Sequence, residues 1–128
     1  MTDTNTALVL LTMLGMKHFV VDFPLQNKFQ WSNKGTYGHA GGILHAGLHG
    51  AGTYFSMLLL YGFSNILLAF AVGLADMLIH YHVDWAKMNI NAKYNWAANT
   101  HDEFWWLLGL DQLLHFLTYI AIVAIVFN

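Results

Sequence analysis

Four apolar stretches of this sequence each carry two ionisable residues that lie four positions apart. The pairs are His18 with Asp22, His45 with His49, His80 with Asp84, and Asp111 with His115. Residues at this spacing share one face of an α-helix, so each stretch directs two polar side chains the same way. The four pairs therefore predict helices whose polar faces meet in the interior of a bundle.

Composition indicates that this bundle lies in a membrane. Hydrophobic residues make up 57% of the 128 residues and charged residues 9%, whereas charged residues form about 25% of an ordinary soluble domain. A spanning helix needs about 20 mostly apolar residues. We predict an all-α polytopic membrane protein with one domain, residues 1–128, built as an antiparallel bundle of four transmembrane helices over about 7–26, 39–61, 63–87 and 103–127. The first stretch has no basic leader or small-residue cleavage pattern, so we expect it to be retained.

The position of each pair within its helix adds a second constraint. The pairs fall near the end of the first helix, the start of the second, the end of the third and the start of the fourth. In an antiparallel bundle these four ends share one side, and the pairs align in two layers. The deeper layer is expected to hold His18, His49, His80 and His115, and the shallower layer Asp22, His45, Asp84 and Asp111.

The lysines predict the orientation in the membrane. All of them lie in or nearer to the first and third connections: Lys17, Lys28, Lys34, Lys87 and Lys93. By the positive-inside rule that side is cytoplasmic, which places both termini on the opposite side. All five tryptophans belong to the same side, where indole rings favour the headgroup level. We expect the connections over 24–38 and 88–102 to lie at the interface and to cover the polar cluster.

The aspartates predict a metal. An aspartate at the centre of a spanning helix costs about 2.5 to 3.5 kcal/mol on insertion scales, and lysines at the membrane edge cannot neutralise several of them. With no cysteine in the chain, imidazole and carboxylate groups would hold a divalent transition metal, zinc first and iron or manganese next, as one or two ions. The candidate ligands are His18, Asp22, His45, His49, His80, Asp84, Asp111 and His115. The alternative is a metal-free hydrogen-bond network with some aspartates protonated.

Other polar residues suggest supporting roles. Asp76 continues the polar stripe of the third helix, and Asp76 or Asp84 could act as a general base. Lys87 could pair with Asp84, bind an anionic headgroup, or anchor the helix at the interface. Gln26 and Gln112 could donate to a bound oxyanion.

A stripe of small residues marks the second helix. Gly42, Ala46 and Gly50 recur every fourth position, which allows close approach of another helix in lipid, either within the chain or in an oligomer. Three more histidines, His39, His82 and His101, are expected outside the cluster.

Taken in order, four motifs resemble those of a family of small bacterial and phage integral membrane proteins of unknown function. They are HFVVDFPLQ (18–26), LHAGLH (44–49), IHYHVDWAK (79–87) and LDQLLH (110–115). The resemblance covers roughly residues 14–119. It implies a bacterial inner membrane, or a host membrane for a phage protein, and a functional set comprising Gln26, Lys87, Gln112 and the eight candidate ligands. It names no substrate.

Two classes of function fit these observations. One is a metal-dependent hydrolase acting on a lipid-linked or phosphate ester substrate that enters from the cytoplasmic interface. The other is non-enzymatic: an ion or proton carrier, or a protein that binds a membrane partner through a buried network. A di-iron oxidase ranks lower because the chain lacks paired histidine runs. The lipid bilayer is the expected partner, an oligomer is possible through the small-residue stripe, and no nucleic acid is expected.

Overall fold

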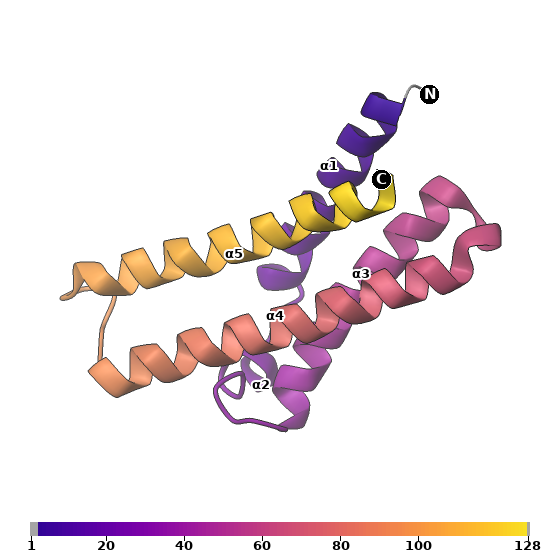
Figure 1. The fold of residues 1–128 in the computed structure, drawn as a ribbon. Coiled ribbons are helices and arrows are strands. Elements are labelled where there is room, and N and C mark those ends of the chain that lie inside the picture. Colours follow the sequence, from indigo (N-terminus) through magenta and orange to yellow (C-terminus); the bar gives the residue numbers. More distant parts are fainter. Residues whose placement is uncertain (1–2, 128) are drawn as a thin grey trace.

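The computed structural model describes residues 3–127, which are helical apart from short connections (Figure 1). The elements are α1 (Asp3–Asp22), α2 (Lys28–Trp31), α3 (Ala40–Tyr61), the 3₁₀ turn η1 (Phe63–Asn65), α4 (Ile66–Tyr94) and α5 (Asp102–Phe127). The four long helices correspond to the four predicted ones.

Two predicted helix ends are wrong. The first helix ends at Asp22 rather than near residue 26, because Pro24 follows and the residue before a proline disfavours helical geometry. The third continues past residue 87 to Tyr94 and ends where Asn95 adopts a left-handed conformation with φ 53°. The end of α4 therefore forms part of what was predicted to be a connection.

The long helices are antiparallel neighbours around a common interior. α3 packs against α1 and α4, and α5 packs against α4 and α1. Figure 1 shows the start of α1 and the end of α5 on the same side of the bundle as the turn between α3 and α4, while α2 and the α4–α5 connection lie toward the other end. The predicted order of the helices is confirmed.

Three helical segments are long and apolar enough to cross a membrane: α1, η1 together with α4, and α5. Large apolar side chains also face outward, such as Leu67 and Leu59, which are 83% and 78% exposed. Both observations fit an integral membrane protein. α3 does not qualify as a span by its hydropathy, because its 22 residues include five glycines and two histidines. The predicted count of four spans is therefore supported for three helices.

The two halves of the bundle differ in chemistry. Toward the chain termini, a core of buried apolar side chains is formed by Leu10, Leu14, Met57, Ala69, Val72, Tyr119 and Ile122. The buried aspartates and histidines lie in the other half, toward α2. The polar cluster is thus on one side of the bundle, as the sequence predicts.

The small-residue stripe of α3 packs inside the chain. A Cβ atom added to Gly50 would lie 2.6 Å from the carbonyl oxygen of Gly73 in α4, so α3 and α4 can approach this closely only with glycine there. Gly42 and Ala46 are also buried within the chain. The close approach that the stripe allows is therefore made within the chain, to α4 and to the segment before α3, and an oligomer through this face stays a prediction.

Candidate metal centre

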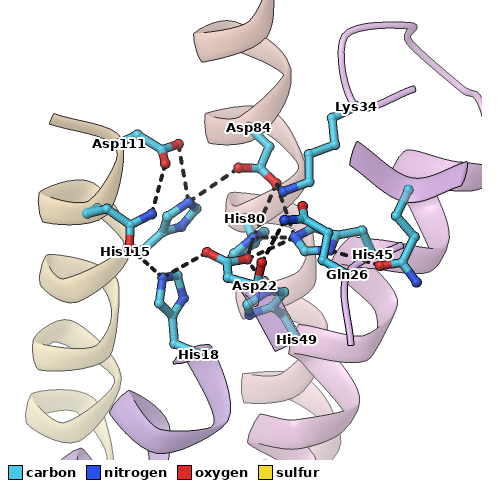
Figure 2. A network of polar contacts seen from close by, with 12 residues as sticks. His18, Asp22, Gln26, Lys34, His45, His49, His80, Asp84, Asp111 and His115 are labelled. Carbon is cyan, nitrogen blue, oxygen red and sulfur yellow. Dashed lines mark hydrogen bonds and ion pairs between the residues drawn. The ribbon is translucent and has the colours of Figure 1, made fainter. Parts of the chain in front are cut away.

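The four ionisable pairs meet in the interior of the bundle. Figure 2 shows their side chains reaching toward one another from α1, α3, α4 and α5. The side chain of His18 is 12% exposed, whereas the seven other members are buried: Asp22, His45, His49, His80, Asp84, Asp111 and His115. The predicted convergence of the four helix faces is present in the structure.

The carboxylate of Asp22 is the centre of the cluster. Its Oδ1 lies 3.1 Å from Nε2 of His45, 3.0 Å from Nε2 of His49 and 3.8 Å from Nε2 of His80. Its other oxygen, Oδ2, lies 3.1 Å from Nε2 of His18. Asp22 can occupy this position because α1 ends there, at the level where α3 and α4 present their histidines.

Two of these histidines also face each other directly. Nε2 of His45 lies 3.3 Å from Nε2 of His80, and both nitrogens are 3.3 Å from Oδ2 of Asp84. Ligand atoms held at 2.0–2.2 Å from one ion lie roughly 3 to 4 Å from each other. Asp22, His45, His49 and His80 have candidate ligand atoms that all lie within 4.8 Å of one another, which is compatible with a single ion.

A second group shares His80 with the first. His80, Asp84 and His115 also offer ligand atoms within 4.8 Å of one another. The imidazole of His80 is stacked between those of His49 and His115, with ring centroids 3.5 and 3.9 Å apart. Nδ1 of His80 is buried and has no hydrogen bond within residues 3–127, so this ring nitrogen is unpaired there.

Gln30 of α2 orients His45. Its Oε1 lies 3.3 Å from Nδ1 of His45, and an amide oxygen can only accept, so this contact favours the tautomer in which Nδ1 carries the proton and the lone pair of Nε2 is free for a metal. This is the arrangement by which outer residues orient metal-binding imidazoles. Sequence reasoning missed Gln30 because α2 has only four residues and no apolar period.

Three lysines enter the bundle, contrary to the expectation that lysines stay at its edge. Nζ of Lys17 lies 2.5 Å from Asp76, Nζ of Lys34 lies 2.9 Å from Asp84, and Nζ of Lys87 lies 3.2 Å from Asp111. Lys87 thus pairs with Asp111 rather than with Asp84. Among the described residues the Asp22 carboxylate contacts only histidines, so three of the four buried carboxylates face an ammonium group and Asp22 does not.

His18 and Asp111 lie beside the two groups and belong to neither. Nδ1 of His18 lies 2.8 Å from the hydroxyl of Tyr119, and its Nε2 lies 3.0 Å from Oε1 of Gln112. The amide nitrogen of Gln112 donates to Asp111 at 3.0 Å. These contacts link α1 to α5 and hold the histidine that touches Asp22.

A cavity of about 400 Å³ opens beside the cluster. It lies between the end of α1, α2, the last turns of α4 and the start of α5. Its polar lining consists of Asp22, Gln26, Lys34, Lys87, Asn91 and Gln112, and the rest of the lining is apolar. Asp22 is thus shared between the cavity and the cluster.

Comparison with known proteins assigns the chain to a family. The model of a family described as protein of unknown function (DUF3307) matches residues 9–128. The chain belongs to the DUF3307 family. No curated protein and no solved structure matches the chain. The resemblance to a family of unknown function is confirmed at that level, and the family description assigns no chemistry to the site.

Asp76 of this DUF3307 chain lies apart from the cluster in which it was predicted to act. Its Oδ2 accepts from Nζ of Lys17 and from the hydroxyl of Thr53, both at 2.5 Å. It belongs to neither group of candidate ligands. Lys17 also donates to the carbonyl oxygen of His49 at 3.2 Å. Asp76 is therefore the end of a structural network beneath the cluster, and Lys17 and Thr53 are members that sequence reasoning missed.

Two histidines expected outside the cluster and one glutamine expected beside it can be compared with the structure of this DUF3307 chain. His82 lies outside the cluster, as expected, with Nε2 3.0 Å from the hydroxyl of Tyr37. His39 caps α3 by accepting from the backbone N–H of Gly41. Gln26 donates its amide N–H to the carbonyl oxygen of Asp22 at 2.6 Å, so it presents an acceptor as well as a donor to the cavity.

Proposed function

We propose that this chain is an integral membrane protein that binds a divalent transition metal ion through Asp22, His45, His49 and His80. The observation that carries the proposal is that their candidate ligand atoms lie within 4.8 Å of one another, with Oδ1 of Asp22 3.0 to 3.8 Å from the three imidazole nitrogens, which is compatible with one ion. Three imidazoles and a carboxylate suit zinc, with iron or manganese as alternatives. Asp84, 3.3 Å from two of the nitrogens, could complete a larger shell or serve a second ion with His115.

Charge supports the same proposal. Each lysine in the bundle faces one aspartate, and the remaining carboxylate, Asp22, has only imidazole nitrogens as side-chain contacts among the described residues. A buried carboxylate without a compensating cation is expensive in an apolar medium. A divalent ion would provide that compensation at the point where the histidines gather.

The competing interpretation is a metal-free network in which His18, His45 and His49 donate to Asp22. Metal content distinguishes the two. We expect protein purified in detergent to contain about one ion of zinc, iron or manganese per chain by elemental analysis, because the ligand set matches these ions. His80→Ala should lose it, and His82→Ala should keep it, since His82 is on the same helix but outside the cluster.

Wild-type protein that holds no metal above background, and takes up none from added zinc, would contradict the proposal. Thermal unfolding of both variants shows whether a loss of metal in His80→Ala reflects a lost ligand or a lost fold. The zinc affinity of His82→Ala provides the reference value for His80→Ala.

The chemistry that best fits such a site is hydrolysis of a lipid-linked or phosphate ester. A divalent ion there would acidify a water molecule and polarise an ester oxygen. Asp84 is positioned beside the ligand nitrogens to accept a proton, and Lys87 lines the adjoining cavity where an anionic group would lie. Asp84 belongs to one of the two groups of candidate ligands and Asp76 to neither, so we assign the base role to Asp84. The apolar core beyond Asp76 favours a one-sided site over an ion pathway.

We further propose that α3 also crosses the membrane, since it packs between α1 and α4, and that the cluster lies on the cytoplasmic side of a bacterial inner membrane or a host membrane. The lysines and tryptophans at that end support this orientation. A chain without cysteine is suited to single-cysteine labelling. An impermeant maleimide added to intact cells should label a cysteine at Ser64 and spare one at Asn33. The reverse pattern would invert the topology.

A further inference from the structure

We propose that the cavity beside Asp22 binds the phosphate-bearing headgroup of an anionic membrane lipid. That such a lipid is the substrate rests on the proposed function. That such a lipid binds here rests on the cavity alone. Its volume of about 400 Å³ falls in the range of ligand sites, about 300 to 1,000 Å³, and suits a phosphorylated headgroup whose acyl chains remain in the bilayer.

Two lysines line the cavity and offer N–H donors to a phosphate. Lys34 reaches the cavity from the segment before α3, and Lys87 reaches it from α4. Each ammonium group has three donors, and one of these faces an aspartate behind the cavity, Asp84 or Asp111. The remaining N–H groups are available to an anionic oxygen lying between the two lysines. Figure 2 shows Lys34 extending inward to Asp84 beside the cluster.

Two amide oxygens indicate what else the ligand carries. Oε1 of Gln26 and Oδ1 of Asn91 are buried and have no hydrogen bond within residues 3–127. Their amide nitrogens are already fixed, because they donate to the carbonyl oxygens of Asp22 at 2.6 Å and Trp96 at 3.1 Å. Unpaired buried acceptors are destabilising, so the site favours a ligand with donors. A glycerol or sugar hydroxyl, or an ammonium group, provides them next to a phosphate.

The apolar part of the lining favours a lipid over a free phosphate ester. Phe23 and Trp31 line the cavity and are 63% and 49% exposed, so they continue the cavity to the outer surface of the bundle. Leu107 and Leu108 of α5 line the cavity as well. A headgroup held by the lysines would leave its acyl chains against these side chains, at the level where aromatic residues meet the bilayer interface.

Native mass spectrometry of the detergent-purified full chain tests the proposal. With phosphatidylglycerol and phosphatidylcholine supplied together, we expect one phosphatidylglycerol to be retained selectively. Lys87→Gln should weaken that binding about tenfold or more, because it removes a charge-assisted hydrogen bond, and Lys87→Arg should largely restore it. Lys93→Gln is the matched control: it removes a lysine from the same helix outside the cavity and should bind within about twofold of wild type.

The outcomes separate this proposal from the metal site. Wild-type protein without preference for phosphatidylglycerol over phosphatidylcholine would overturn the lipid site even if metal is bound. His80→Ala should lose the metal and retain the lipid, since His80 does not line the cavity. Glycerol 1-phosphate that binds as tightly as phosphatidylglycerol would show a site for free phosphate esters and overturn the lipid assignment. Selectivity is measured on the wild type, so the test stands even if Lys87→Gln is unstable.

Discussion

Replacement of Gln30 by leucine gives a sharp test of how the cluster is oriented. Gln30 is 3% exposed, and its oxygen lies 3.3 Å from Nδ1 of His45. When Nε2 binds a metal, Nδ1 must keep its proton, and leucine leaves that buried N–H unpaired. An unpaired buried group costs about 1 to 3 kcal/mol. The hydrogen bond is long, so we expect the lower part of that range, about 1 to 2 kcal/mol, which weakens metal binding roughly 5- to 30-fold.

The metal-free protein should suffer less. Without a metal, His45 can move its proton to Nε2 and donate to Asp22, which lies 3.1 Å away. This charge-assisted bond offsets part of the loss. The effect of Gln30→Leu should therefore appear mainly in the dissociation constant for zinc, measured in detergent by competition with a chromophoric chelator, and less in the thermal stability of the metal-free protein.

Gln30→Glu is the control for this substitution. It preserves an acceptor of the same length and adds a charge, and a carboxylate behind a ligating histidine raises the basicity of the ring. Zinc affinity should be retained or increased. The reasoning would be refuted if Gln30→Leu bound zinc within about twofold of wild type, or if its metal-free stability fell as much as its affinity.

Two further predictions concern the packing beneath the site. Gly50→Ala should destabilise the bundle by about 1 to 3 kcal/mol, because its Cβ would lie 2.6 Å from the carbonyl oxygen of Gly73. Gly47→Ala is the control and should be neutral, because a Cβ there has nothing within 4 Å. Equal unfolding curves of the two variants in detergent would contradict the close contact. Lys17→Met should lower the free energy of unfolding by about 3 to 5 kcal/mol, because it leaves Asp76 charged and buried. Adding Asp76→Leu should recover most of that stability. A double variant as unstable as the single one would show that the ion pair is not the cause.

The arrangement of the helices was predictable because its cause is local. Spacing of four residues determines which side chains share a helix face, and apolar length determines which segments are long enough to span a membrane. Antiparallel order then brings the pairs together without further information. The end of α4 was not predictable in this way, since its last turns lie beyond the apolar run and are held by tertiary contacts, such as the hydrogen bond from Asn89 to the carbonyl oxygen of Gly35 at 3.0 Å.

The partners of the aspartates were not predictable because they depend on long, flexible side chains. Lys17 precedes a ligand candidate by one residue, so its Cα lies on a neighbouring face of α1, and only the reach of its side chain brings Nζ to Asp76. Lys34 comes from a connection without regular structure and still pairs with Asp84. Hydropathy treats both residues as membrane anchors. Both side chains point inward because carboxylates lie opposite them, and sequence spacing does not show which lysine faces which carboxylate.

These lysines make the metal proposal narrower than the sequence alone allowed. If no lysine lay beside the buried aspartates, one metal ion, two metal ions or protonation of the carboxyl groups could each explain how they are stabilised. With Lys17, Lys34 and Lys87 each facing one carboxylate, Asp22 is the buried carboxylate of the cluster that has no lysine beside it. That residue also has three imidazole nitrogens within 3.8 Å of one oxygen, Oδ1. Apolar side chains can often replace a buried ionic network without loss of stability, so stability alone does not account for this one. The concentration of ligand atoms around the one unmatched charge therefore favours a site that holds a cation.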